Sequence, residues 1–402
     1  MTEAEDPSVT NISVDVIIIG GGIAGLWTLA RLQQEGYNAI LLESEALGAG
    51  QTRYAQGIIH GGTKYALTGK LTASSAAVAA MPARWRACYE GTGELDLSAA
   101  ELLSSAHYLW STGRLGSRIS GFFASKVMRS RSTELSREAL PSLFQHPAFK
   151  GQLYQLDEPV FNTLSVIRAI AEPLKKNILP IAENSLQHGD DSVVVTSQGG
   201  ENYRFHYQSV LLMAGEGNEN LLSRFDCNTP QMQRRPLKMV IVRGGLTDRV
   251  YAHCLGASVN PRITITSHFD ADGNIVWYLG GQLAENGVHK TPAALIHDAK
   301  KELAELIPWL VLKQPQWGVL EINRAEIKKA GSTRPDSFSI EQSGNIITAW
   351  PTKLALSPAL ADALLDKIKA DTQPAREKPN LPAWPSPVYA DFPWNNPDIW
   401  QK

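Results

Sequence analysis

Residues 14–36 read VDVIIIGGGIAGLWTLARLQQEG, and this stretch decides the fold. Its first six residues are mostly apolar and β-branched, which is typical of a central parallel strand buried on both faces. The strand runs directly into Gly20, Gly22 and Gly25, which have the spacing G-x-G-x-x-G. In such a turn the first glycine permits a tight bend, the second lets the backbone approach a pyrophosphate, and the third lets helix and strand pack closely. A helix is expected over residues 23–36, with the positive end of its dipole at the phosphates.

A second apolar strand is expected over residues 39–42, and it ends in Glu43. An acidic residue about 20 positions past the glycines is typical of dinucleotide-binding units, in which it binds ribose hydroxyls. Strand, glycines, helix, second strand and acid occur here in the expected order, so the sequence predicts an α/β fold with a Rossmann-like unit. The carboxylate of Glu43 would repel a 2′-phosphate, which leaves FAD or NAD as the nucleotide.

Composition places the rest of the chain among globular proteins. The chain has 402 residues, of which 43% are hydrophobic and 19% charged, and this length corresponds to two or three domains. The formal net charge of -2 gives no electrostatic reason to expect a nucleic acid as partner. The three cysteines form no C-x-x-C pair, which fits buried thiols in a reducing compartment. No segment reaches the ~18 consecutive apolar residues of a membrane span, and the acidic N-terminus is unlike a signal peptide.

The segment after Glu43 distinguishes between FAD and NAD as the cofactor. An NAD domain would continue with further βα units, whereas residues 48–65 read GAGQTRYAQGIIHGGTKY, a glycine-rich polar loop. This loop resembles that of the D-amino-acid oxidase superfamily of FAD-dependent oxidoreductases, and most closely that of glycerol-3-phosphate dehydrogenases and their 2-hydroxyacid-oxidising relatives. The matching positions are Thr52, Arg53, Ile59, His60, Gly61, Gly62, Lys64 and Tyr65.

Three later blocks extend the resemblance in the same order along the chain. LMAGEGNENLL at residues 212–222 is similar to the superfamily's second cofactor loop, and AGSTRPDSF at residues 330–338 is similar to its G-x-R-P segment. AWPTKLALSPALADALLDKI at residues 349–368 is similar to its last flavin loop and helix. The resemblance implies that FAD is the cofactor and that the chain is an oxidoreductase.

The resemblance also implies roles for individual side chains. His60 would take the hydroxyl proton of an alcohol substrate as the hydride leaves, a task that suits the ordinary imidazole pKa of about 6.5. Lys353 would stabilise negative charge on the reduced flavin, and Arg334 would bind an anionic group of the substrate. Lys64 stands where the glycerol-phosphate enzymes usually have an arginine, which weakens the prediction of a phosphate ligand.

Further positions are implied as contacts of the substrate or of the cofactor. The expected substrate contacts are Lys64, Tyr65, Tyr251, His253 and Tyr278, the last three on strands that would cover the flavin. The expected cofactor contacts are Gly20, Gly22, Ile23, Ala24, Gly25, Glu43, Ser44, Thr52, Arg53, Gly57, Ile58, Ile59, Leu186, Ala214, Gly215, Thr352, Lys353 and Leu354. No metal site is expected.

The order of these blocks predicts a Rossmann-like FAD-binding domain that is discontinuous in sequence, with a second, mainly antiparallel substrate domain. Strand patterns dominate residues 236–309, with a helix expected over residues 292–306. A tail with Trp384, Trp394 and Trp400 is too aromatic to float free, so it either straps its own chain or docks a partner. The FAD-binding domain is predicted to comprise residues 14–90, 160–225 and 325–370. The substrate domain is predicted to comprise residues 91–159 and 226–324, and the C-terminal strap residues 371–402.

The leading hypothesis is an FAD-dependent oxidase or dehydrogenase acting on a small anionic 2-hydroxy compound, such as a hydroxyacid or glycerol 3-phosphate. An amine or amino-acid oxidase on the same fold is the first alternative. An RNA-modifying flavoprotein and a nicotinamide dehydrogenase with an unusual loop are further alternatives. No second G-x-G-x-x-G exists for NAD(P)H, so electrons are expected to pass to oxygen, a quinone or a carrier protein. We expect a cytoplasmic protein, peripheral to the inner face of a membrane if the acceptor is a membrane quinone.

Overall fold

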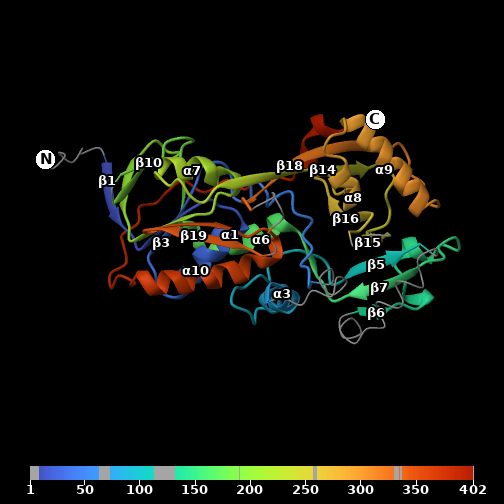
Figure 1. Ribbon diagram of the computed structural model, residues 1–402, viewed down its shortest axis with the longest axis horizontal. Coiled ribbons are helices and arrows are strands. Elements are labelled where there is room, and N and C mark those ends of the chain that lie inside the picture. Colours follow the sequence, from blue (N-terminus) through green and yellow to red (C-terminus); the bar gives the residue numbers. More distant parts are fainter. Residues whose placement is uncertain are drawn as a thin grey trace.

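The computed structural model describes residues 9–62, 73–112, 132–189, 191–256, 260–329, 335 and 337–401. These residues form two lobes side by side along the long axis of the molecule (Figure 1). The long strands β14 (Met232–Arg243) and β18 (Gln316–Ile327) pair antiparallel and extend from one lobe into the other. Within the described ranges no helix is long and apolar enough to cross a bilayer.

The first lobe is built on a six-stranded sheet with the order β19-β20-β13-β2-β3-β9. Five strands are parallel, and β19 pairs antiparallel at one edge. The strands are β2 (Val16–Ile19), β3 (Ala39–Glu43), β9 (Ile178–Pro180), β13 (Ser209–Leu212), β19 (Ser339–Ser343) and β20 (Ile346–Trp350). The carboxyl ends of β2 and β13 therefore bring Gly20 next to Ala214, at the edge where doubly wound sheets bind ligands.

Alternate side chains of this sheet enter two separate cores. Ile18 and Leu41 face a helical layer of α1 (Ile23–Gln34), α3 (Ala73–Tyr89), α6 (Thr163–Ala171) and α10 (Ser357–Asp371). Ile17 and Ile40 face a second layer that contains α7 (Asn218–Arg224) and a four-stranded sheet. The strands of that sheet are β1 (Val9–Ser13), β10 (Gln187–His188), β11 (Ser192–Thr196) and β12 (Asn202–His206).

The second lobe is built on an eight-stranded sheet with the order β18-β14-β17-β16-β15-β5-β7-β6. All neighbouring strands are antiparallel except β15 and β5. The helix α9 (Pro292–Leu306) has the predicted bounds and packs on one face of the sheet. The other strands are β5 (His107–Ser111), β6 (Ser132–Glu134), β7 (Gln152–Leu156), β15 (Tyr251–Leu255), β16 (Ile263–Phe269) and β17 (Ile275–Gly280). Two smaller elements lie outside these sheets. They are the antiparallel pair of β4 (Leu102–Ser104) with β8 (Val160–Phe161) and the short helix α8 (Gln282–Asn286).

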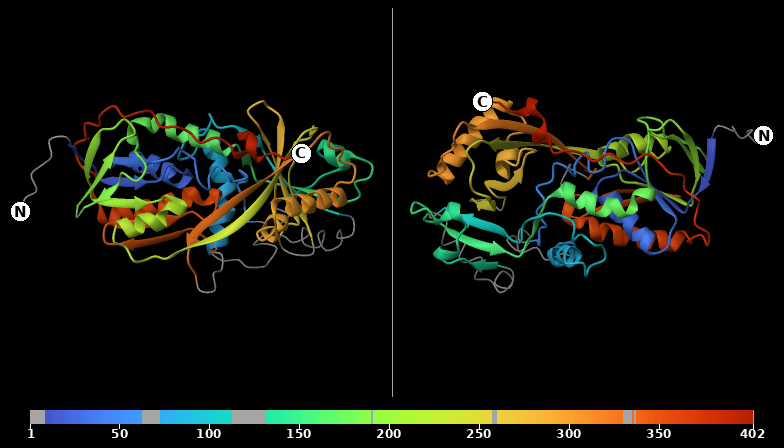
Figure 2. Two further views of the ribbon diagram at one scale, coloured as in Figure 1. Left: turned by 90° about the horizontal axis from the view of Figure 1, so that it is seen from above. Right: turned by 180° about the vertical axis from the view of Figure 1, so that it is seen from behind.

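The C-terminal tail crosses from the first lobe to the second (Figure 2). Near its middle, the N–H of Leu47 donates to the carbonyl of Val388, and the N–H of Ala390 donates to the carbonyl of Leu47. At its end, Gln401 and Trp317 exchange two backbone hydrogen bonds of 2.7 and 2.8 Å. The tail thus lies on its own chain. The strands of the parallel sheet come from the three segments predicted to form the FAD-binding domain. The exact bounds of the domains stay a prediction.

Candidate active site

A cavity of about 1110 Å³ lies where the two lobes meet, between the carboxyl ends of the parallel strands and the eight-stranded sheet. Ligand sites for one drug-sized molecule are typically about 300–1,000 Å³, so this volume suits a dinucleotide together with a small substrate. In the part of the chain that the structure describes, no three His, Cys, Asp or Glu side chains gather as they would around a metal ion.

The glycine turn forms one end of this cavity. Gly20 has a φ of +119°, and a Cβ there would lie 2.7 Å from the backbone of Ala214. A Cβ on Gly25 would lie 2.0 Å from the carbonyl oxygen of Gly20, so this glycine is required for helix–strand packing. A Cβ on Gly22, in contrast, would meet only the hydroxyl of Thr52, at 3.4 Å. That hydroxyl accepts the N–H of Ile23 at 3.2 Å, in the first turn of α1.

Glu43 ends β3 beside this turn and lines the cavity. Its carboxylate accepts the backbone N–H of Gly21 at 2.5 Å and that of Glu45 at 2.7 Å. Burial raises the pKa of Glu43, and the hydrogen bonds from Glu45 and Gly21 oppose that shift. The carboxylate is thus held at the tip of the strand, where an acceptor for ribose hydroxyls is needed.

These residues fit FAD. The open cradle at Gly22 and the start of α1 suit a diphosphate, and Glu43 suits the ribose. Bound FAD would supply the hydride acceptor, and the protein would position and desolvate it together with the substrate. The predicted cofactor contacts that line the cavity are Gly20, Gly22, Ile23, Ala24, Glu43, Ser44, Thr52, Gly57, Ile58, Leu186, Ala214, Gly215, Thr352, Lys353 and Leu354.

Three predicted cofactor contacts do not line the cavity. Gly25 faces the strand before it, as its close approach to Gly20 shows. Ile59 is fully buried in the core of the first lobe. Arg53 lies with its guanidinium 5.1 Å from the ring centre of Tyr54.

His60 stands at the wall of the cavity with its imidazole 41% exposed. Its Nδ1 lies 3.3 Å from Oε2 of Glu158, whose side chain is only 4% exposed. The other oxygen of Glu158 accepts the N–H of Gly61 at 2.7 Å. Burial alone would raise the pKa of Glu158, but the hydrogen bonds from His60 and from the Gly61 N–H hold that pKa below its usual value. The carboxylate is therefore charged at neutral pH.

Two further histidines pack against this pair. The ring of His253 stacks on that of His60 at 5.5 Å, and its Nδ1 lies 2.7 Å from the hydroxyl of Thr264. The ring of His107 meets that of His253 edge-on at 4.2 Å. Burial lowers the pKa of His107 to about 3, so this imidazole is neutral at physiological pH. Neither ring nitrogen of His107 has a hydrogen-bond partner among the residues described.

Two of the three predicted tyrosine contacts lie away from the cavity. Tyr278 is fully buried, lies outside the cavity lining, and donates its hydroxyl to the carbonyl of Tyr54 at 3.0 Å. Tyr251 is buried against Ile58 and Val160 behind the wall, and burial raises its pKa to about 12. His253 is the member of this predicted group that reaches the cavity. The predictions for Lys64, Tyr65 and Arg334 fall outside the described residues.

Sequence motifs gave no signal for Glu158, His107 or Arg324. His107 begins β5, which pairs with β15 and so lies beside His253. Glu158 follows β7 and is brought to His60 where Val160 pairs with Ile58 and the N–H of Ile59 donates to the carbonyl of Pro159. Arg324 lies on β18 and lines the cavity, with its guanidinium 3.8 Å from the carboxylate of Glu285. Lys353 also lines the cavity, just before the short 3-10 turn that leads into α10.

Comparisons with known proteins agree with this architecture. Residues 15–348 match the family described as FAD dependent oxidoreductase (DAO). The probable FAD-dependent oxidoreductase PA4991 of Pseudomonas aeruginosa is 46% identical over 385 residues, which cover 95% of this chain and 98% of that protein. The crystal structure of PA4991 superposes with a TM-score of 0.83 at 40% identity, over 97% of this chain and 99% of that one.

More distant structures share the fold alone. Glycine oxidase from Geobacillus kaustophilus superposes with a TM-score of 0.62 at 13% identity, over 90% of this chain and 96% of that one. The L-alpha-glycerophosphate oxidase from Mycoplasma pneumoniae, with FAD bound, gives a TM-score of 0.61 at 14% identity, over 92% and 99%. With the glycine turn, Glu43 and the cavity in place, the chain belongs to the DAO family of FAD-dependent oxidoreductases and uses FAD as its cofactor.

Proposed function

We propose that this enzyme oxidises a small anionic 2-hydroxy compound, such as a 2-hydroxyacid or glycerol 3-phosphate. The observation that carries the proposal is the pairing of His60 with the buried carboxylate of Glu158 at the cavity wall. An alcohol loses its hydroxyl proton as its hydride leaves, so its oxidation needs a base, whereas an amine can react already deprotonated. A histidine oriented by a buried carboxylate is the usual form of such a base.

In this proposal Nδ1 of His60 donates its hydrogen to Glu158, which leaves Nε2 to accept the substrate's hydroxyl proton. The charged carboxylate then stabilises the imidazolium that forms. The stacked ring of His253 limits the rotation of His60 from one side. The base is thus held in one orientation before the substrate arrives, which lowers the cost of reaching the reactive geometry.

The anionic group of the substrate is assigned to the cations of the cavity. Arg324 and Lys353 both line it, and a guanidinium offers the fork that binds a carboxylate or a phosphate through two parallel hydrogen bonds. Lys64, Tyr65 and Arg334 remain further predicted contacts from the resemblance. Electrons are proposed to leave to oxygen, a quinone or a carrier protein, since the sequence carries one dinucleotide fingerprint only.

Oxidation of an amine or amino acid is the second candidate, and two acidic side chains favour it. Glu285 and Glu321 line the same cavity as Arg324. An amino acid with its carboxylate on Arg324 would find a partner for its ammonium group in Glu285, whose carboxylate lies 3.8 Å from that guanidinium. The two candidates differ in their need for a base, so they respond differently to loss of His60.

The test is anaerobic reduction of the purified holoenzyme by a panel of 2-hydroxyacids, glycerol 3-phosphate and amino acids. Bleaching of the flavin absorption bands by a hydroxy compound, with loss of that bleaching in His60→Asn, supports the proposal. Bleaching by amino acids alone, at a rate that His60→Asn leaves unchanged, overturns it in favour of the amine reaction. Acceptors are then distinguished by hydrogen peroxide release in air and by reduction of a soluble quinone.

A further inference from the structure

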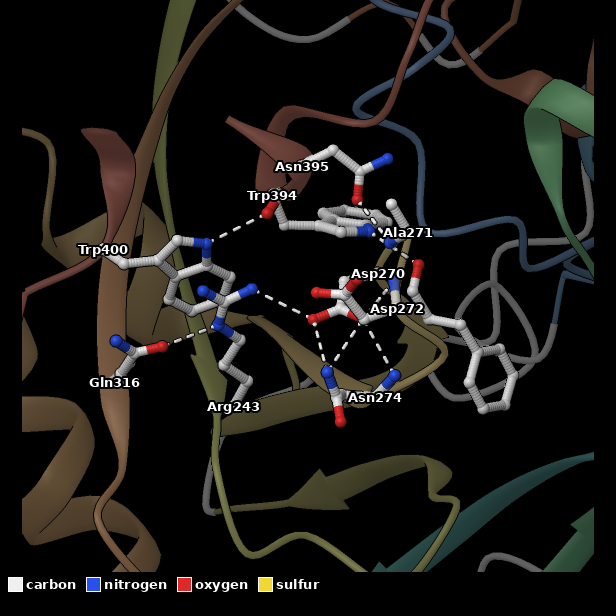
Figure 3. Close-up of polar contacts among 10 residues, drawn as sticks. Arg243, Asp270, Ala271, Asp272, Asn274, Gln316, Trp394, Asn395 and Trp400 are labelled. Atoms are coloured by element: carbon white, nitrogen blue, oxygen red, sulfur yellow. Dashed lines mark hydrogen bonds and ion pairs between the residues drawn. The ribbon is translucent and has the colours of Figure 1, made fainter. Parts of the chain in front are cut away.

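Residues 392–401, near the end of the chain, pack on the second lobe. We call this segment the C-terminal clamp. Trp394 is fully buried, and its indole N–H donates to the carbonyl of Phe269 at 3.0 Å. The side-chain oxygen of Asn395 accepts the N–H of Ala271 at 3.0 Å (Figure 3). Together with the backbone pair between Gln401 and Trp317, these bonds fix the clamp at both ends.

Arg243 contacts the clamp with its charged side chain. The guanidinium of Arg243 lies 4.3 Å from the ring centre of Trp400, and it forms an ion pair of 3.0 Å with Asp270 (Figure 3). Asp270 also accepts backbone N–H groups of the turn that joins β16 to β17. The indole N–H of Trp400 donates to the carbonyl of Trp394 at 2.9 Å. The clamp is therefore a built structure with satisfied polar groups, unlike a frayed terminus.

A chain of contacts leads from the clamp to the cavity. The ring of Trp394 lies 5.6 Å from that of Tyr278. The hydroxyl of Tyr278 donates to the carbonyl of Tyr54, and the carbonyl of Tyr278 accepts the side-chain amide of Gln56 at 3.0 Å. The amide of Gln56 also donates to the hydroxyl of Thr266 at 3.1 Å. Residues 54–57, which line the cavity, are thus tied to β16 and β17.

The same hydrophobic cluster touches both the clamp and the cavity. Trp394, Tyr278 and partly buried Tyr54 share it with Leu237 and Met239. Tyr54, Leu237 and Met239 also line the cavity. Because side chains two residues apart on a strand share a face, the face of β14 that covers the cavity continues outward to the clamp. Displacing Trp394 would leave this cluster without one of its fully buried side chains.

We propose that Trp394 and Tyr278 are positioning residues for FAD. Trp394 holds Tyr278 in place, and Tyr278 holds residues 54–57 in the geometry that encloses the bound cofactor. The C-terminal clamp, although outside the nucleotide-binding lobe, thereby sets how tightly the enzyme retains FAD. The proposal concerns the cofactor and does not depend on the identity of the substrate.

The first test is Tyr278→Phe, which removes one hydroxyl and keeps the ring that packs on Trp394. FAD release from the diluted holoenzyme, followed by the rise of free flavin fluorescence, should become about fivefold faster, the effect of one lost neutral hydrogen bond. The melting temperature with saturating FAD should change little. Release at the wild-type rate with an unchanged visible spectrum overturns the proposal.

The second test compares two tryptophans of the same tail. Trp394→Ala should speed FAD release at least as much as Tyr278→Phe, and Trp394→Phe should restore most of the retention because it keeps a ring against Tyr278. Trp384→Ala is the matched control, since Trp384 packs on the four-stranded sheet of the first lobe and donates to the carbonyl of Lys176. Equal acceleration by Trp384→Ala would assign the effect to general loosening of the tail and overturn the proposal.

A double variant tests whether Trp394 acts on FAD release through Tyr278. If Trp394 acts through Tyr278, the effects of Trp394→Ala and Tyr278→Phe on the release rate combine to less than their product. Fully multiplicative effects contradict the proposed chain of contacts. If Trp394→Ala does not fold, Trp394→Leu takes its place in the comparison, because it keeps an apolar side chain but no ring against Tyr278.

Discussion

The carboxylate of Glu158 lies 3.3 Å from Nδ1 of His60, although 98 residues separate the two in sequence. The carboxylate is nearly inaccessible, and the imidazole is open to the cavity. Glu158 therefore orients the imidazole of His60, and the second ring nitrogen of His60, Nε2, can contact a ligand in the cavity. This division between an oriented base and its buried partner underlies the proposed chemistry.

Replacement of His60 by Asn should slow anaerobic flavin reduction by the true substrate by about 10²–10⁴-fold, the usual contribution of a positioned base. The visible spectrum and FAD content should match those of the wild type, because His60 is not needed for the nucleotide cradle. Stopped-flow absorbance measures the rate. A reduction rate within about threefold of wild type would remove proton abstraction by His60 from the mechanism.

Replacement of Glu158 by Gln keeps the shape of the side chain and removes its charge. The Gly61 N–H retains an oxygen acceptor, but the imidazolium of His60 loses its counter-ion, so flavin reduction should slow by about 10²-fold or more, by analogy with other carboxylate–histidine pairs. Single-turnover kinetics at saturating substrate measure the effect. An unchanged rate with an altered KM would reassign Glu158 to substrate binding.

Two glycines of the nucleotide turn should respond differently to alanine. Gly25→Ala places a Cβ 2.0 Å from the carbonyl of Gly20, so the first lobe should be destabilised by several kcal/mol and the protein should be recovered largely insoluble. Gly22→Ala meets only the Thr52 hydroxyl at 3.4 Å, so this variant should fold and lose FAD affinity instead. Thermal unfolding with and without added FAD separates the two outcomes. Equal melting curves for both variants would contradict the assigned roles.

Lys353 lines the cavity just before the turn that leads into α10. Removal of its charge by Lys353→Met should slow flavin reduction by about tenfold or more while leaving the fold intact, because a cation there favours negative charge on the reduced cofactor. Lys353→Arg is the matched variant and should retain most of the rate. A shift of the flavin reduction potential to more negative values in Lys353→Met, measured by dye equilibration, is the independent readout.

The nucleotide-binding half of this site could be predicted because its signals are local in the sequence. Gly20, Gly22 and Glu43 are fixed by spacing along one strand–turn–helix–strand unit, and the structure places all three at the cavity. Local rules also gave the bounds of α9. Proline sets a further local bound: α6 ends at Ala171, and the chain continues through Pro173 as a 3-10 helix.

The substrate half could not be predicted in the same way. His107 approaches His60 through the parallel pairing of β5 with β15, and Glu158 does so where Val160 pairs with Ile58. No local pattern specifies either pairing. Tyr278 was expected at the cavity from its place on β17. Five of the six residues of that strand are buried, so alternation does not show which face meets the cavity. The clamp covers the face to which Tyr278 belongs.

The stability of the folded protein should fall as the pH is lowered from about 6.5 to 5, because two histidines are buried in neutral form. Burial lowers the pKa of His107 to about 3 and that of His268 to about 3. In the unfolded chain both imidazoles bind a proton near the ordinary pKa of about 6.5, so the unfolded state takes up more protons below that pH. The folded state therefore loses stability as the pH falls, by about 1.4 kcal/mol per pH unit for each histidine once the unfolded state is fully protonated.

Denaturant unfolding at a series of pH values measures this dependence, and the slope is the readout, not the absolute free energy. His107→Gln removes one of the two protonation events, so its unfolding free energy should fall less steeply between about pH 6.5 and 5 than that of the wild type. His289→Gln, which removes an imidazole at an exposed position, is the matched control and should show the wild-type slope. Parallel curves for His107→Gln and the wild type would mean that His107 is protonated in the folded protein, and the buried imidazole behind His253 would then carry a charge.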